Sequence, residues 1–231
     1  MTDGLFEGSV YFGVCVSLAA YAAGVWLRKK TGWSFMNPLL VSIVLVIAAL
    51  LVCGIGYGTY NESASWLSYL LTPATVCLAV PLYEQFSLLR RHGKAVLLGI
   101  AAGVLAGLVT ILVLAWLFSL DHSAYVTLLP KSITTAIGIG VSEELGGHVS
   151  LTVVVIIITG VLGNIFAEGV CKVFRITEPV AAGVAIGTST HAVGTARAME
   201  MGEIQGAMSS LSIVVAGLLT VVGANLFARF L

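Results

Sequence analysis

Residues 97–120 read LLGIAAGVLAGLVTILVLAWLFSL, an uninterrupted apolar run in which no side chain is charged. About 20 apolar residues in a helix are enough to cross the hydrocarbon core of a bilayer. The run is too long for a strand, and its composition suits lipid better than the core of a soluble domain. It therefore predicts a transmembrane helix, within a segment that extends over residues 95–120.

The rest of the chain has the same character. Of its 231 residues, 58% are hydrophobic and only 10% are charged, whereas an ordinary soluble domain carries about 25% charged residues. Similar apolar segments occupy residues 10–27, 38–57, 66–89, 124–145, 151–174, 180–199 and 207–231. We therefore expect an all-α, polytopic membrane bundle of about seven or eight segments, with the lipid bilayer as its surroundings.

Charge narrows the function classes. The formal net charge is zero, so no nucleic-acid partner is expected. Neither an HExxH zinc motif nor a GxSxG nucleophile motif is present in the sequence. We expect no catalytic residues, no metal site and no cofactor, and we do not expect an enzyme.

The basic residues predict the topology, because positive charge concentrates in cytoplasmic loops. This rule places Arg28–Lys30 and Arg90–Lys94 in the cytoplasm. If residues 124–145 crossed the membrane, Lys172 and Arg175 would lie outside. If that segment instead dips in and returns, both lie inside, and Arg229 joins them should residues 180–199 cross. The re-entrant alternative agrees better with the charges, and both alternatives stay open here.

Two polar stretches interrupt the apolar sequence: PKSITT at 130–135 and GTSTHAVGTAR at 187–197. A charge in mid-membrane costs at least roughly 2.5–3.5 kcal/mol, and residues that bear it usually belong to a solute or ion pathway. Both surrounding segments also contain several glycines, which predicts interrupted or re-entrant helices that line a protein-covered cavity. Together these features predict a membrane transport site.

The first stretch has the chemistry of an anion site. Lys131 offers an ammonium group, and Pro130 suits the first turn of a helix, whose free N–H groups attract anions. This combination fits a carboxylate ligand. The alternative is that Lys131 extends to the lipid headgroups. The substrate-binding candidates of this stretch are Lys131, Ser132, Thr134 and Thr135.

The second stretch adds an imidazole and further hydroxyls. On a helix, Thr188, His191 and Thr195 fall on one side. Neutral His191 can donate to a carboxylate or relay a proton; the alternative is a hydrogen-bond partner between helices. Arg197 has its own alternative, an i, i+3 ion pair with Glu200. The substrate-binding candidates here are Thr188, Ser189, His191, Thr195 and Arg197.

Three further features complete the sequence-based expectations. Glu143 joins His191 as a candidate for proton coupling. Glu168 and Lys172 are spaced for an i, i+4 ion pair. Residues 72–84 weakly resemble residues 130–143 in the order of proline, threonine and glutamate, which makes an internal repeat of the kind found in transporters a candidate feature.

The ordered motifs at 130–135, 142–147 and 191–198 (PKSITT, SEELGG and HAVGTARA) resemble the LrgB/CidB family of bacterial membrane proteins over essentially the whole chain. The resemblance implies a single LrgB-like transmembrane domain over residues 1–231 in the bacterial inner membrane. It also implies two alternative functions. One is holin/antiholin-like modulation of murein hydrolase activity and lysis, together with a small LrgA/CidA-type membrane protein. The other is carboxylate transport, as in relatives linked to bacterial pyruvate uptake and to plastid glycolate and glycerate transport.

The residues favour transport of a small 2-keto or 2-hydroxy acid such as pyruvate, lactate or glycolate. A lysis regulator has no need of Lys131, His191 and several hydroxyls inside the bilayer, whereas a short polar acid does. We expect Lys131 and His191 to share one sheltered pocket. An unselective oligomeric pore is a third alternative, and glycine-rich helix faces such as Gly99, Gly103 and Gly107 would allow a homodimer.

Overall fold

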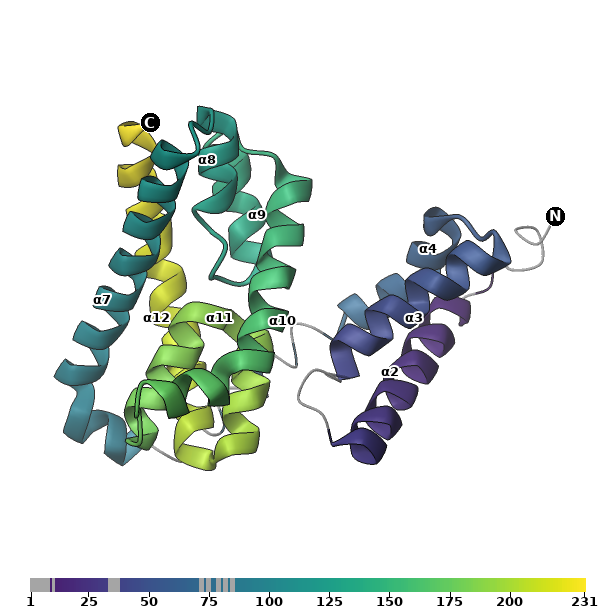
Figure 1. Ribbon diagram of the computed structural model, residues 1–231, viewed down its shortest axis with the longest axis horizontal. Coiled ribbons are helices and arrows are strands. Elements are labelled where there is room, and N and C mark those ends of the chain that lie inside the picture. The colour runs from purple at the N-terminus through teal and green to yellow at the C-terminus, as the bar shows by residue number, and fades with distance from the viewer. Residues whose placement is uncertain are drawn as a thin grey trace. The chain divides into compact units, whose positions relative to one another are not determined.

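The computed structural model describes residues 9, 11–32, 38–70, 73, 76, 77, 80, 83 and 86–231. Its regular elements in these ranges are all helices (Figure 1). The chain divides into two compact units, Met1–Cys77 and Leu78–Leu231. The all-α prediction is confirmed. Most of the predicted segment 66–89, and with it the first member of the candidate repeat at 72–84, lies outside the described residues.

The first unit contains α2 (Phe12–Thr31), α3 (Pro38–Cys53) and α4 (Tyr57–Ser68). Glycine 32 ends α2 with a left-handed φ of 67°, and its N–H donates to the Arg28 carbonyl. Close packing of α2 on α4 depends on Gly13, whose N–H donates to the Ser63 hydroxyl at 2.7 Å. The sequence analysis did not predict α4, which is a polar helix between two apolar segments.

The second unit is organised by three long helices: α7 (Phe86–Leu117), α10 (Val149–Val173) and α12 (Glu203–Phe227), the last extended by a 3₁₀ turn at Ala228–Phe230. Among the described residues, three helical stretches are long and apolar enough to cross a membrane: Gly93–Leu117, Val149–Val173 and Glu203–Phe230. These stretches lie within the predicted segments 95–120, 151–174 and 207–231 or extend them by a few residues.

The predicted segment 124–145 does not cross the unit. It forms α8 (His122–Leu128) and α9 (Thr135–Glu144), joined by a turn. The Ser123 hydroxyl donates to the Gly146 carbonyl at 3.1 Å, and the His148 N–H donates to the Thr127 hydroxyl at 2.7 Å. The beginning of α8 therefore lies beside the end of α9, so this segment, here called hairpin one (residues 122–147), is re-entrant (Figure 1).

The segment α11 (Pro179–Met201) is a second re-entrant hairpin, here called hairpin two. Its helical backbone breaks at His191, where φ is 46° and ψ is −146°. The two arms then run back along each other, since Ala182 and Ile186 of the first arm share an apolar cluster with Ala198 of the second. Because hairpin two does not cross the unit, the condition under which Arg229 was expected in the cytoplasm does not hold, and α12 carries Arg229 to the end opposite Lys172.

The two hairpins enter from opposite ends of the second unit. Hairpin one precedes α10 and hairpin two precedes α12, so the same pattern of hairpin and span appears twice in inverted orientation (Figure 1). Inverted repeats with broken helices are typical of secondary transporters. This pairing of residues 122–173 with 179–227 differs from the pairing suggested by the sequence.

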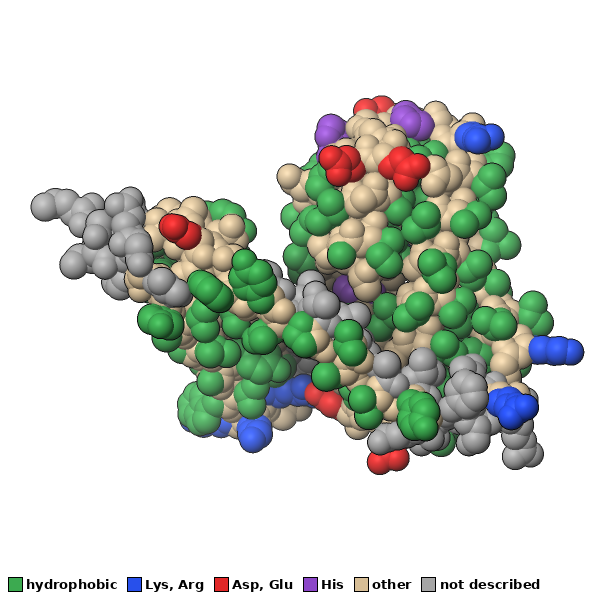
Figure 2. Space-filling view, turned by 180° about the vertical axis from the view of Figure 1, so that it is seen from behind, with side chains coloured by type: hydrophobic (Ala, Val, Ile, Leu, Met, Phe, Trp, Pro, Cys, Tyr) green, Lys and Arg blue, Asp and Glu red, His purple; other side chains and the backbone are tan. Residues whose placement is uncertain are grey.

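Charge distinguishes the two ends of the second unit. Acidic and histidine side chains gather over the end where hairpin one enters (Figure 2), while the loop between α10 and hairpin two at the other end contains Arg175. Lys94, near the start of α7, and Lys172, near the end of α10, also belong to this second end. From the rule that positive charge concentrates in cytoplasmic loops, we expect this second end to be cytoplasmic.

Candidate functional site

A cavity of about 620 Å³ lies inside the second unit, between α7, α12 and both hairpins. On α7, three glycines at four-residue intervals face it and leave room that side chains would fill. The polar and glycine lining comprises Gly99, Gly103 and Gly107 of α7, Lys131 and Ser132 of hairpin one, Glu178 just before hairpin two, Thr188 and Ser189 of hairpin two, and Thr220 of α12. The two polar stretches of the sequence thus meet at one cavity.

The cavity reaches from the cytoplasmic end to the middle of the bilayer. Exposed Glu178 lines it at the cytoplasmic end, and Gly103 and Gly107 lie on either side of the midpoint of the Gly93–Leu117 span. Beyond that level, an apolar cluster joins α7, hairpin one and α12. Its buried members include Leu108, Ile111, Tyr125, Leu129, Ile133 and Ala224. The cavity therefore extends from the end near Glu178 to about the midpoint of the Gly93–Leu117 span, and the apolar cluster lies beyond that level.

Lys131 lies in the turn of hairpin one, just before α9 begins. Its ammonium donates to the Ser132 hydroxyl at 3.0 Å. In the described part of the chain, no acidic side chain lies within ion-pair distance of Lys131. Thr134 occupies the N-cap position of α9, and its side chain makes no cap hydrogen bond, so the first N–H groups of α9 add partial positive charge near Lys131.

Thr188 and Ser189 lie side by side on the first arm of hairpin two and differ in their hydrogen bonds. The Ser189 hydroxyl donates to the Ala185 carbonyl at 2.7 Å. The Thr188 hydroxyl is buried and, of the described side chains, is the buried polar group without a hydrogen-bond partner. A buried hydroxyl without a hydrogen bond lowers the stability of the fold. Of the cavity residues, Thr188 would therefore be stabilised most by a polar ligand.

His191 does not line this cavity. It is only 4% exposed, and its Nε2 is hydrogen-bonded to the Ile156 carbonyl of α10 at 3.0 Å. A Cβ added at Gly160 would lie 2.7 Å from this nitrogen, so the missing side chain at Gly160 makes room for the ring. The structure thus supports the alternative of an inter-helix hydrogen-bond partner and does not place His191 in the Lys131 cavity.

The other candidates also lie outside the cavity lining. Thr195 is buried, with its hydroxyl 2.7 Å from that of Ser209 on α12. Thr134 and Thr135 are half-buried at the start of α9, and Glu143 is exposed in its last turn, on the acidic outer end. Thr134, Thr135 and Glu143 belong to hairpin one, and Thr195 belongs to hairpin two. None of these four residues lines the cavity.

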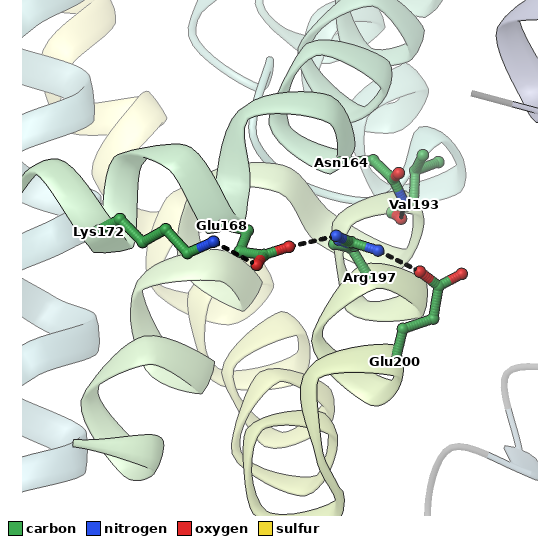
Figure 3. Close-up of polar contacts among 6 residues, drawn as sticks. All are labelled: Asn164, Glu168, Lys172, Val193, Arg197 and Glu200. Atoms are coloured by element: carbon green, nitrogen blue, oxygen red, sulfur yellow. Dashed lines mark hydrogen bonds and ion pairs between the residues drawn. The ribbon is translucent and has the colours of Figure 1, made fainter. Parts of the chain in front are cut away.

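Arg197 belongs to an ionic cluster between α10 and the second arm of hairpin two (Figure 3). Its guanidinium pairs with Glu168 and, at 2.5 Å, with Glu200. Lys172 completes the cluster through Glu168 at 2.8 Å, and these residues line a separate hollow of about 720 Å³. The i, i+4 pair and the Glu200 alternative are both present in the structure.

Above this cluster, the Asn164 amide donates to the Val193 carbonyl at 2.7 Å, close to the break at His191 (Figure 3). This contact and the His191–Ile156 hydrogen bond both join the turn of hairpin two to α10. The irregular turn of hairpin two is therefore held in place by α10.

Sequence reasoning missed the cavity role of Gly99, Gly103, Gly107, Glu178 and Thr220. The three glycines were interpreted only as packing glycines, and Thr220 stands alone in an apolar run. The one available signal was the Thr220 hydroxyl in one span together with the glycines in another span, a combination that could have indicated a shared cavity. Glu178 precedes Pro179 at the start of α11, and a capping position gives no indication of a cavity.

Apolar spans and two re-entrant hairpins, around a cavity with a few polar groups, define a multi-pass helical membrane protein. A model of the LrgB-like family matches residues 17–230. The antiholin-like protein LrgB of Bacillus subtilis (strain 168) is 37% identical over 224 residues, which cover 96% of this chain and 97% of that protein. Proteins of the same name from Bacillus mycoides (strain KBAB4) and Bacillus cereus (strain B4264) are each 36% identical, over 96% of both chains.

The chain belongs to the LrgB-like family, and the resemblance seen in the sequence is confirmed. It is a multi-pass protein of the bacterial plasma membrane in the holin/antiholin-like group. No solved structure matches the chain significantly.

Proposed function

We propose that the protein is a carrier for small carboxylates of the pyruvate, lactate or glycolate type. The observation that carries this proposal is Lys131, a cation near mid-membrane that lines a cavity and has no acidic partner among the described residues. Lys131 is half-buried, and a charge within the bilayer that lacks a counter-charge is unfavourable. An anionic substrate would supply that counter-charge, and the start of α9 would add N–H donors to the same carboxylate.

The remaining polar groups suit the other oxygens of such an acid. Ser132, Thr188, Ser189 and Thr220 surround the cavity with hydroxyls, whereas most of the remaining lining is apolar or glycine. One cation and several hydroxyls match a short acid with one carboxylate and one additional oxygen. Thr134, Thr135, Thr195 and Arg197 support the hairpins that present these groups.

The inverted hairpins suggest how the cavity could become accessible from either side of the membrane. Hairpin one and its apolar cluster would close the outer side of the cavity, and hairpin two enters from the cytoplasmic side. Movement of one repeat against the other would exchange the open side. Proton coupling is assigned to His191 or Glu143; His191 lies at the turn of hairpin two, whereas Glu143 is exposed at the outer end.

The proposed assembly is an LrgB-like domain over residues 1–231, to which the family match at 17–230 gives support across both compact units. It acts without catalysis and with a separate small LrgA/CidA-type membrane protein. A homodimer is part of the proposal.

The second candidate function is antiholin-like modulation of murein hydrolase activity and lysis, which the names of the relatives favour. That function needs partner binding but no substrate in the cavity. It predicts that polar exchanges at Lys131 and Thr188 are tolerated, whereas loss of partner binding abolishes activity.

The test is uptake of radiolabelled lactate into proteoliposomes that contain the protein alone or with its LrgA/CidA-type partner. We expect saturable uptake that unlabelled pyruvate and glycolate inhibit, because all three acids offer the same carboxylate and adjacent oxygen. Absence of saturable flux in both preparations would contradict carrier function. Unsaturable entry of unrelated solutes would indicate a pore.

A further inference from the structure

The Thr188 hydroxyl has an exceptional environment within hairpin two. Serine and threonine hydroxyls in helices commonly donate to the carbonyl four residues earlier. In this hairpin Ser189 does so to Ala185, and Thr190 does so to Ile186 at 2.6 Å. Thr188 is 7% exposed and makes no such bond. Its hydroxyl is therefore buried and unpaired, whereas the hydroxyls of its two neighbours are paired.

The packing of α7 fixes the orientation of this side chain. A Cβ placed at Gly103 would lie 2.8 Å from the Thr188 methyl carbon but 4.0 Å from its hydroxyl oxygen. The methyl group thus fits against the glycine, and the hydroxyl is the atom turned away from α7. Because a side chain at position 103 would displace the methyl group, Gly103 keeps the hydroxyl in its unpaired orientation.

Thr188 and Lys131 reach the same cavity from the two hairpins. Lys131 contributes a cation with a single hydrogen bond, to Ser132, and Thr188 contributes a group that both donates and accepts. A carboxylate held by Lys131 leaves the rest of the acid in the cavity that Thr188 lines. In such a substrate, the oxygen on carbon 2 is the polar group nearest to the carboxylate.

We propose that Thr188 is the specificity-determining residue that recognises the oxygen on carbon 2 of the transported acid, an inference that rests on the carboxylate carrier function proposed above. A site built to hydrogen-bond a substrate oxygen rejects the analogue that lacks it, because a polar group of the protein then stays unpaired. Acids with a 2-hydroxyl or 2-keto oxygen are accepted, and alkyl acids of equal size are rejected.

Lactate and propionate provide the test, because they share three carbons and one carboxylate and differ by the 2-hydroxyl. Uptake of each labelled acid is measured in proteoliposomes, always with the LrgA/CidA-type partner present. Wild-type protein is expected to prefer lactate at least about tenfold in uptake efficiency. Thr188→Val preserves shape and removes the hydroxyl, so the preference is expected to fall to about one, through loss of lactate uptake and not of propionate uptake.

Two variants serve as controls. Thr190→Val removes a nearby hydroxyl that lies outside the cavity lining and is already paired with the Ile186 carbonyl, and Thr188→Ser keeps the hydroxyl while losing the methyl group. Both are expected to retain the lactate preference. The melting temperature of Thr188→Val in detergent is expected to equal or exceed that of wild type, since an unpaired buried hydroxyl has been removed.

The outcomes separate this inference from the carrier function. An unchanged lactate preference in Thr188→Val would overturn the role of Thr188 while leaving carboxylate transport intact. Equal loss of lactate and propionate uptake in that variant would overturn it as well, because the change would then act on transport generally. If wild-type protein transports neither acid, the proposed function itself fails.

Discussion

Lys131→Ala is expected to lower the efficiency of lactate uptake by about 10- to 100-fold. A hydrogen bond to a charged group contributes about 1.5–3 kcal/mol, and each 1.4 kcal/mol corresponds to a factor of ten. In the cavity the Lys131 ammonium has the Ser132 hydroxyl as its hydrogen-bond partner and no carboxylate within ion-pair distance among the described residues. The substrate would be the principal counter-charge of Lys131, so removal of the ammonium group affects substrate binding most. Initial uptake rates at low lactate concentration measure the effect.

The matched control is Lys172→Ala, which removes a lysine whose side chain is 75% exposed. An exposed ion pair contributes little, so this variant is expected to transport lactate nearly as well as wild type. Lys131→Ala should keep the wild-type melting temperature in detergent, because loss of an uncompensated charge does not destabilise the fold. Full uptake by Lys131→Ala would remove Lys131 from the site.

Gly163→Val is expected to destabilise the second unit by about 1–3 kcal/mol, the usual cost of overpacking, and to abolish uptake. A Cβ at position 163 of α10 would lie 2.6 Å from the Cβ of Thr190 and even closer to its methyl group. Gly194, on the returning arm of hairpin two, contacts the same side chain. Thr190 is thus enclosed by two glycines, and a valine at position 163 of α10 would force the hairpin away from that helix.

Gly169→Val is the control on the same helix, because a Cβ there meets nothing within 4 Å. Thermal unfolding in detergent is expected to show a lowered melting temperature for Gly163→Val and little change for Gly169→Val. The double variant Gly163→Val, Thr190→Ala should recover part of the loss. Similar stability of both single variants would show that this contact does not hold hairpin two.

The sequence was sufficient to predict the membrane class and the two polar stretches, because long apolar runs and buried charges are local signals. Charge also favoured the re-entrant course of hairpin one. The sequence could not predict the reversal at His191, since a left-handed φ of 46° at a non-glycine residue depends on contacts with α10. For the same reason the sequence placed His191 beside Lys131, whereas the imidazole is used to hold the turn.

Other parts of the site depend on partners that are distant in sequence. Arg197 is 29 residues from Glu168, and the glycines of α7 are more than 80 residues from Thr188. Periodicity places Thr188 and Thr195 on one side of a continuous helix, but the break between them sends Thr188 to the cavity and Thr195 to Ser209 on α12. Tertiary contacts therefore decided which hydroxyls of the second polar stretch face a ligand.

The most direct test of a carrier with a site shared by two inverted hairpins is counterflow. Proteoliposomes containing the protein and its LrgA/CidA-type partner are loaded with excess unlabelled lactate and diluted into a trace of labelled lactate. Alternating access predicts transient accumulation of label above its external concentration, with no such accumulation for Lys131→Ala. Label that only equilibrates, to the same level with or without internal lactate, would contradict the carrier account.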